Sequence, residues 1–455
     1  MSNQDEPTGP GPRRRYVERT DRSRALYDRA RERLPGGNTR TTVFHQPYPS
    51  YIADSEGCRV VDIDGNEHVD FFNNAASLIH GHAPPEVLEQ AREAMDRGTA
   101  PGGPTESEVE WAEHLCDRLP AIERVRFTNS GTEATMNAMR AVRAYTGNDV
   151  VAKFEGIYHG TQDDAKMSID PPASLRGPPD APNTVPDSAG IPEGRTDEVL
   201  VLPFNDADST IERLRSRRED LAGVFVAPYM GSAVVPADER FLARLREFTD
   251  EHDVPLVFDE VISFRVAHGG AHAALGVEPD LVTLGKIIGG SFPVGAFGGR
   301  ADIMTGFDPR VGAIPHGGTF NGNPVTATAG LAALERYTPG EVERLNDLAS
   351  SLADRCESVA DDHGVAVAVN TAGSLFNIYL SDAPVCNYRD AAKSPGELER
   401  QLYFALLDRG VRVVPKLFGS LSTPMDETHV ETFVTAFDEA LGELYEEFEM
   451  RGLTV

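Results

Sequence analysis

The sequence has little lysine and little cysteine. Only five of its 43 basic residues are lysine, and the other 38 are arginine. The four cysteines are far apart and form no CxxC pair, which argues against a structural zinc site or a disulfide framework and favours a reducing cytoplasm. The histidines also lack the spacing of metal ligands, so no metal site is expected.

Long apolar runs are absent as well. No stretch approaches the ~20 apolar residues of a membrane span, and no basic segment followed by an apolar one opens the chain, so neither a membrane protein nor secretion by a signal peptide is expected. The formal charge of −29 repels phosphate backbones and argues against general nucleic-acid binding. With 40% hydrophobic residues the chain can bury a large core, which predicts a globular, cytoplasmic protein.

The excess of acidic residues has two interpretations. One is the charged surface of an ordinary soluble protein. The other is adaptation to high salt, because a surface poor in lysine and rich in carboxylates stays hydrated where salt screens charge. The combination of 72 acidic residues with five lysines favours the halophilic interpretation.

Composition divides the chain into four predicted segments. Residues 1–16, rich in Pro, Gly and polar residues, are predicted to form a disordered tail. Residues 17–84 are predicted to join a small domain, residues 85–330 to form a large domain, and residues 331–455 to form a helix-rich C-terminal small domain. Within the second segment, alternating residues around Asp64-Gly65-Asn66 indicate a β-hairpin.

Helices alternate with short apolar runs from residue 85 onward. Such runs, joined by helices, are typical of a mainly parallel sheet covered on both faces, so we expect an α/β large domain and a smaller α+β domain. Seven strands are predicted, at residues 125–128, 150–154, 199–202, 223–227, 256–259, 281–284 and 295–298. Helices are predicted at residues 85–97, 106–119 and 132–145. Residues 170–197 are too long for an ordinary connection and are predicted to be a lid or a mobile insert.

Two strand ends carry polar groups that can bind a ligand. Ser130, Gly131 and Thr132 lead from a strand into a helix, where free backbone N–H groups can hold a phosphate, although an ordinary helix cap is the simpler alternative. Asp259 and Glu260 end another apolar strand, the place where open α/β sheets bind ligands, unless these carboxylates face solvent.

Lys286 ends a third apolar strand. Partial desolvation there favours a neutral amine, which can form a Schiff base, whereas the alternative is a lysine that extends to the surface. The other four lysines lack this apolar setting in the sequence. A phosphate site, a carboxylate and an amine at three strand ends match the needs of pyridoxal 5'-phosphate (PLP).

A series of motifs carries a family resemblance along most of the chain. In order they are PGGNTR (35–40), GHAPPEV (81–87), FTNSGTEA (127–134), RAYTGND (143–149), KFEGIYHG (153–160), VPDSAGIP (185–192), LPFND (202–206), VFDEV (257–261), LGKIIGG (284–290), PVGAFGGR (293–300) and GGTFNGNP (317–324). With these motifs the chain resembles class-III PLP-dependent aminotransferases of fold type I, in the subgroup that is similar to glutamate-1-semialdehyde 2,1-aminomutase.

The resemblance implies roles for the residues at the three strand ends. Lys286 would be the Schiff-base lysine, and Asp259 would pair with the pyridinium nitrogen. Ser130, Gly131 and Thr132 would form the phosphate loop.

Further roles follow from the same resemblance. Tyr158 would lie over one face of the PLP ring with His159 beside it, and Val261 would pack on the opposite face. Thr319 would reach the phosphate of a neighbouring subunit, which implies a homodimer with the active site at the subunit interface. Arg40 is the candidate for binding the substrate carboxylate, because Asn38-Thr39-Arg40 resembles an element of some β-amino-acid aminotransferases; a surface-paired arginine is the alternative, and Arg265 is a second candidate.

The chain departs from the aminomutase pattern where the substrate should bind. Residues 227–229 read Ala-Pro-Tyr in place of Glu-Pro-Val, and residues 73–77 replace an aromatic element. Phe418 is not followed by a glutamate, and the segment after the VFDEV motif is shortened to Ser-Phe-Arg at residues 263–265. These changes favour retained PLP chemistry on a different amino donor.

The leading prediction is therefore a class-III aminotransferase that moves an amino group between an amino acid, β-amino acids included, and a keto acid. The alternative is glutamate-1-semialdehyde 2,1-aminomutase, supported by residues 185–192, which resemble the gating loop of those enzymes. A PLP-binding pseudoenzyme is a third and more remote interpretation.

Overall fold

The structure is a computed structural model, and it describes residues 11–312 and 314–454. The chain separates into two compact units. The large unit comprises residues 85–343 and 386–391, and the small unit comprises the residues up to 84, residues 344–385 and those from 392 onward. None of the helices that the structure describes is long and apolar enough to cross a membrane.

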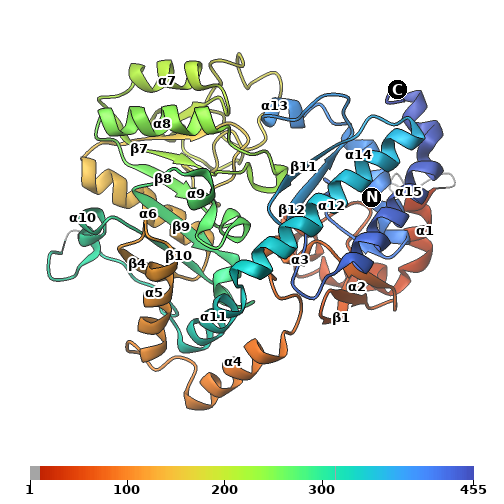
Figure 1. The fold of residues 1–455 in the computed structure, drawn as a ribbon, viewed down its shortest axis with the longest axis horizontal. Coiled ribbons are helices and arrows are strands. Elements are labelled where there is room, and N and C mark those ends of the chain that lie inside the picture. The colour runs from red at the N-terminus through yellow and green to blue at the C-terminus, as the bar shows by residue number, and fades with distance from the viewer. Residues whose placement is uncertain (1–10, 313, 455) are drawn as a thin grey trace. The chain divides into compact units, whose positions relative to one another are not determined.

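A seven-stranded sheet runs through the large unit. Its order is β4-β10-β9-β8-β7-β5-β6, and much of this order can be followed in Figure 1. Only β10 runs antiparallel to its two neighbours, so the sheet is mainly parallel. The strands are β4 (Arg124–Thr128), β5 (Val150–Phe154), β6 (Val199–Leu202), β7 (Leu221–Val226), β8 (Leu256–Asp259), β9 (Leu281–Gly285) and β10 (Gly295–Gly299). The predicted α/β fold with seven strands is confirmed.

Helices cover this sheet, which explains why its strands read as continuous apolar runs. Helix α6 packs against β4, β7, β9 and β10 with a small-residue face that includes Ala134, Ala138 and Ala141. On α5, Trp111 stacks on Phe127 of β4 with the ring centroids 4.1 Å apart. The helices are α4 (Pro85–Arg97), α5 (Glu106–Arg118), α6 (Gly131–Thr146), α7 (Ala207–Ser216), α8 (Glu239–Glu251), α9 (Gly270–Leu275), α10 (Ala301–Met304), α11 (Pro324–Arg336) and α13 (Tyr388–Ala391).

The small unit contains two antiparallel or mixed sheets and its own helices. One sheet has the order β1-β2-β3-β13 and the other β11-β12-β14. The strands are β1 (Ile52–Glu56), β2 (Arg59–Asp62), β3 (Glu67–Asp70), β11 (Ala368–Ala372), β12 (Leu375–Tyr379), β13 (Val411–Arg412) and β14 (Phe418–Ser420). Its helices are α1 (Pro12–Arg19), α2 (Asp21–Ala30), α3 (Asn73–Ala76), α14 (Gly396–Asp408) and α15 (Glu427–Met450), and α12 (Pro339–His363) crosses from one unit to the other. The predicted hairpin is the antiparallel pair β2–β3.

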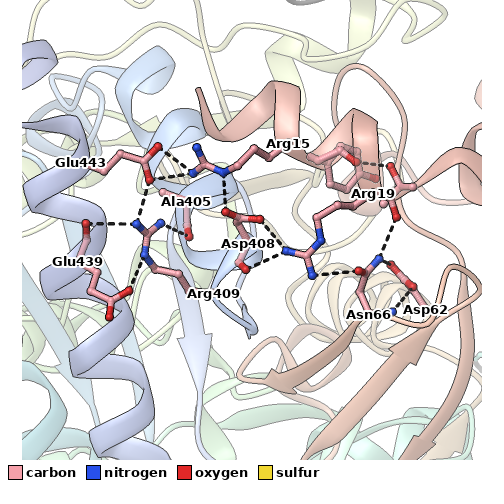
Figure 2. A network of polar contacts seen from close by, with 11 residues as sticks. Arg15, Arg19, Asp62, Asn66, Ala405, Asp408, Arg409, Glu439 and Glu443 are labelled. Carbon is pink, nitrogen blue, oxygen red and sulfur yellow. Dashed lines mark hydrogen bonds and ion pairs between the residues drawn. The ribbon is translucent and has the colours of Figure 1, made fainter. Parts of the chain in front are cut away.

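Residues 12–16, which were predicted to belong to a disordered tail, are helical. Residues 1–10 lie outside the described part, but α1 begins at Pro12 and Tyr16 is buried. Figure 2 shows why the segment is ordered: Arg15 donates to Asp408 of α14 at 2.6 Å and to Glu443 of α15 at 2.8 Å. The proline-rich composition was therefore misleading, because long-range ion pairs and one buried aromatic ring fix the helix.

The long segment 170–197 is anchored within the large unit. Arg389 of α13 makes a bidentate ion pair with Glu155 at 2.7 and 2.9 Å, and its remaining N–H groups donate to the carbonyl oxygens of residues 176–178. Tyr388 also donates its hydroxyl hydrogen to Asp170 at 2.8 Å. These contacts hold the first part of the segment, and a role of the remainder as a lid stays a prediction.

Helix α3 is a left-handed turn. Its four residues, Asn73, Asn74, Ala75 and Ala76, have φ angles of 45°, 49°, 59° and 62°. The left-handed conformation costs a residue with a side chain roughly 1–2 kcal/mol. The surrounding structure must therefore stabilise the turn. Asn73 and Ala76 are fully buried, and Asn73 Nδ2 donates to the carbonyl oxygen of Ser420 at 2.7 Å.

Candidate active site

The register of the sheet places the three predicted strand ends next to one another, on the same side of the sheet. Gly295 of β10 pairs with Thr128 of β4 on one side and with Gly285 of β9 on the other. Asp259 of β8 pairs with Thr283 of β9. The phosphate loop, Asp259 and Lys286 therefore follow neighbouring strands, although more than 150 residues separate the first from the last.

Glycines let these three elements approach each other. A methyl group added to Gly131 would lie 3.0 Å from Cγ1 of Val261, and one added to Gly285 would lie 3.2 Å from the same atom. One added to Gly295 would lie only 2.0 Å from the carbonyl oxygen of Ser130. Val261 thus lies against both the phosphate loop and the residue that precedes Lys286.

Asp259 is buried and fully hydrogen-bonded. Its Oδ2 lies 2.7 Å from Nδ1 of His159, and its Oδ1 accepts from the backbone N–H of Val261 and the hydroxyl of Thr283, each at 3.1 Å. A buried carboxylate requires such donors or a cation, so the alternative that Asp259 faces solvent is excluded. Thr283 was not predicted from the sequence; a lone polar residue inside the apolar run 281–284 was the available signal.

Burial lowers the pKa of His159, against the opposing effect of the Asp259 carboxylate. The side chain is fully buried, and its Nε2 has no hydrogen-bond partner among the described residues. Within the described residues Nδ1 is therefore the one side-chain atom of His159 with a polar partner, the carboxyl group of Asp259. The expected place of His159 beside the PLP ring stays a prediction, and in the structure its side chain contacts Asp259.

Lys286 begins the 3₁₀ helix Lys286–Gly289 with a left-handed φ of 51°. Burial lowers its pKa to about 8, with Asp259 raising it and Arg265 lowering it further. Over the described parts of the chain its amine has no hydrogen-bond acceptor. Arg265 itself is fully buried. Lys286 is therefore an amine that loses its proton more readily than an ordinary lysine, and the nearby Asp259 opposes this loss.

Lys286 is not the one lysine in apolar surroundings, contrary to our expectation. Lys153 lies inside β5, is fully buried, and has a pKa lowered to about 7 by burial. It differs from Lys286 because its amine donates to the backbone carbonyl oxygens of Ala165 and Met167. These hydrogen bonds give Lys153 a structural role.

In the predicted phosphate loop, Ser130 caps the N-terminus of α6, and Glu133 binds the residue before Ser130. Ser130 Oγ accepts from the backbone N–H of Glu133 at 3.2 Å, and Glu133 Oε2 accepts from the backbone N–H of Asn129 at 2.7 Å. The Ser-x-x-Glu pattern could have predicted Glu133 in this role. The backbone N–H groups of Gly131 and Thr132 have no acceptor within the described residues. They are the first donors of α6, a 16-residue helix whose N-terminus favours an anion.

Three predicted residues lie in more exposed positions. Tyr158 is 53% exposed, and burial of the rest of its side chain raises the pKa of its hydroxyl. Thr319 lies in the exposed loop before α11, and Asn321 in that loop accepts from Asn129 Nδ2 at 2.7 Å. Arg40 belongs to the small unit, and its guanidinium donates to Asn74 at 2.7 Å.

These residues fit PLP. Two unpaired N–H groups at a helix N-terminus suit the phosphate, the His159–Asp259 pair suits a pyridinium nitrogen, and Lys286 supplies a free amine. The absence of a side chain at positions 131, 285 and 295 lets the residues at these three strand ends lie close together. No cluster of three or more metal-ligating side chains occurs in the described residues.

Comparison with known proteins agrees with this geometry. The family model "Aminotransferase class-III" matches residues 42–421. The chain belongs to the class-III aminotransferase family. It is therefore an enzyme of a PLP-dependent family, and the sequence-based recognition of family and cofactor is confirmed.

Class-III relatives with different activities resemble the chain. Glutamate-1-semialdehyde 2,1-aminomutase from Methanocaldococcus jannaschii is 38% identical over 92% of this chain and 97% of its own length. An omega-transaminase from Sphaerobacter thermophilus is 46% identical with a TM-score of 0.90, covering 94% of this chain and 98% of that one. A β-phenylalanine aminotransferase from Variovorax paradoxus is 34% identical with a TM-score of 0.87, covering 96% and 97%.

Proposed function

We propose that this class-III enzyme transfers an amino group between an amino acid, β-amino acids included, and a keto acid. The amine of Lys286, with its lowered pKa and no hydrogen-bond acceptor in the described residues, carries the catalytic part of the proposal. The 46% identity to the Sphaerobacter omega-transaminase and the 34% identity to the Variovorax β-phenylalanine aminotransferase support transamination. The loss of the glutamate expected at position 227 supports a donor other than glutamate-1-semialdehyde.

Each residue has a defined part in this proposal. When bound, PLP supplies an aldehyde for amine exchange and a ring that accepts electrons. Lys286 would hold the cofactor and would move a proton at the substrate carbon as base and acid. Asp259, held in place by its three hydrogen bonds, would pair with the pyridine nitrogen.

Other residues bind and orient. The N–H groups of Gly131 and Thr132, with Ser130, hold the phosphate, and Val261 and Tyr158 hold the ring from opposite faces. Arg40 binds the substrate carboxylate. Thr319 serves the phosphate of a second subunit, so the working form is a homodimer with the active site at its interface.

A half-reaction screen tests the donor. Purified holoenzyme is mixed with α-, β- and ω-amino acids. The absorbance of the cofactor is then followed, because it changes when the amino group is transferred from the donor. We expect a response from a carboxylate-bearing donor and its loss in Lys286→Ala, while Lys166→Ala, which changes a lysine elsewhere in the same unit, responds normally. A holoenzyme absorption band that persists unchanged in Lys286→Ala would disprove the role of Lys286.

The aminomutase activity is the second candidate, supported by the 38% identity to the Methanocaldococcus enzyme and by the loop at residues 185–192. It predicts conversion of glutamate-1-semialdehyde to 5-aminolevulinate with no added keto acid. That result, combined with no response to any amino acid in the screen, would replace the aminotransferase proposal.

A further inference from the structure

The guanidinium of Arg40 is held by a neutral side chain and not by a carboxylate. Its guanidinium NH1 donates to Oδ1 of Asn74 at 2.7 Å, and its backbone N–H donates to Asn38 at 2.9 Å. In the described residues no carboxylate lies within ion-pair distance of it, although the sequence has 72 acidic residues. Arg140 is bound in the same way, by the amide oxygen of Asn137 at 3.0 Å, whereas Arg15 and Arg389 each bind a carboxylate. A neutral partner thus holds Arg40 without cancelling its charge.

The amide of Asn74 is oriented by a second contact. Its Nδ2 donates to Oγ of Ser77 at 3.2 Å, and the Ser77 hydroxyl in turn donates to the backbone oxygen of Asn74 at 2.9 Å. Because the amide nitrogen is engaged by Ser77, the oxygen is the atom that faces Arg40. The amide therefore presents an acceptor to the guanidinium.

The backbone of Asn74 is held in place by the turn in which it lies and by the contacts of that turn. It lies in the left-handed turn of α3, where Asn is one of the few residues other than Gly that adopts such angles readily. Ser77 N donates to the carbonyl oxygen of Asn73 at 2.9 Å, and the buried Asn73 side chain is bound to Ser420 of β14. The turn is thus attached to a strand, which gives the side chain of Asn74 a defined place.

We propose that Asn74 is a positioning residue that holds the Arg40 guanidinium in place and leaves its charge available, so that the enzyme selects amino donors with a carboxylate. This rests on the proposed function, in which Arg40 binds that carboxylate. The chemistry requires a neutral acceptor at position 74. An acidic residue there would keep the hydrogen bond but pair with Arg40 and compete with the substrate.

Three variants separate the effect of a charge at position 74, the loss of the acceptor for Arg40 and a change in the backbone of the turn. Asn74→Asp keeps the left-handed turn and an acceptor but adds a negative charge. Asn74→Gly keeps the turn and removes the acceptor. Ala75→Gly relaxes the same turn without touching the contact to Arg40 and is the matched control, because Ala75 also has a left-handed φ of 59°.

Two amino donors that differ in the carboxylate report the effect. They are 3-amino-3-phenylpropanoate and 1-phenylethylamine, each used in single-turnover reactions with the holoenzyme. For the carboxylate donor we expect KM to rise about tenfold in Asn74→Asp, the size of one lost contact to a charged group, and less in Asn74→Gly. The maximal rate should change little, and 1-phenylethylamine should react with all variants alike. High salt should reduce the Asn74→Asp effect because it screens the new ion pair.

Other outcomes overturn the proposal. If Arg40→Ala raises KM for the carboxylate donor but Asn74→Asp does not, the positioning role fails and the proposed function stands. If Ala75→Gly is as impaired as Asn74→Gly, or both donors are affected equally, Asn74 acts on the fold alone. If the wild-type enzyme converts no carboxylate donor, the proposed function and this inference fail together.

Discussion

At the scale of single residues, two lysines with pKa values lowered by burial differ in their hydrogen bonding. Lys153 and Lys286 both have pKa values lowered by burial, to about 7 and about 8. Lys153 donates to two backbone carbonyl oxygens, whereas Lys286 has no acceptor in the described residues and lies at a strand end beside Asp259. Burial alone therefore does not identify the lysine that we propose as catalytic, and the absence of a hydrogen-bond acceptor among the described residues is what separates Lys286 from Lys153.

The buried Lys153 predicts a specific dependence of stability on pH. Its pKa falls from 10.5 in the unfolded chain to about 7 in the folded state, so between these values the unfolded chain binds the extra proton. The free energy of unfolding of the wild type should therefore rise with pH there, relative to Lys153→Met, with a slope approaching ~1.4 kcal/mol per pH unit. Below the folded pKa the difference between the two proteins should be constant.

Chemical denaturation of both apoproteins across this range measures the slope. Taking the difference between wild type and Lys153→Met removes the contributions of other titrating groups. Equal pH dependence of the two proteins would mean that Lys153 keeps its ordinary pKa and that its two carbonyl contacts hold a charged amine.

At the scale of elements, the site depends on how closely a strand and a loop approach. Strand β10 lies between β4 and β9, so its first residue, Gly295, faces the start of the phosphate loop. Only a residue without a side chain leaves room there for the carbonyl oxygen of Ser130. The glycine is needed for its size, since its φ angle is not left-handed.

Gly295→Ala should displace the phosphate loop. The new methyl group would lie 2.0 Å from the backbone oxygen of Ser130 and 2.4 Å from Thr128 Oγ1, so the loop must move. Overpacking of this kind costs about 1–3 kcal/mol, and we expect PLP to bind at least about tenfold more weakly. Absorbance titration of the apoprotein with PLP gives the dissociation constant, and thermal unfolding gives the change in stability.

Gly194→Ala is the control, because nothing lies within 4 Å of its added methyl group and its backbone is not left-handed. It should bind PLP like the wild type. Wild-type affinity in Gly295→Ala would show that the phosphate is held elsewhere than at the start of α6.

At the scale of the whole molecule, charge repulsion competes with ion pairing. The net charge is −29, and arginines such as Arg15, Arg19 and Arg409 pair with carboxylates in the network of Figure 2. Exposed pairs contribute about 0–1 kcal/mol each and weaken as salt rises. The repulsion between acidic residues acts over the entire surface and also weakens in salt. The stability gained from weaker repulsion should therefore exceed the stability lost from weaker ion pairs.

We therefore propose a salt-adapted protein whose stability increases with salt. The midpoint of thermal unfolding should be higher in about 2 M KCl than in 0.1 M, where charges interact over about 10 Å. Sedimentation velocity should show a dimer at high salt that dissociates as salt is removed. Arg15→Met should lower the midpoint more at low salt than at high salt. A midpoint that falls or stays level on adding salt would leave the ordinary acidic surface as the interpretation.

Much of the fold and cofactor chemistry could be predicted from the sequence, because both depend on local patterns. Apolar runs mark strands wherever they are buried on both faces, and a Ser-Gly-Thr turn into a helix marks an anion site wherever it occurs. The sequence accordingly determined the seven strands, the family and the use of PLP.

Only the tertiary structure decided which long-range partners each polar group finds. The order of helix α1 depends on Asp408 and Glu443, which lie 393 and 428 residues from Arg15. The structural role of Lys153 depends on two carbonyl oxygens, and the neutral partner of Arg40 depends on a left-handed turn that includes two alanines. Hydrogen bonds and ion pairs act over a few ångströms in space irrespective of separation along the chain, so these roles were fixed by folding and not by the local sequence.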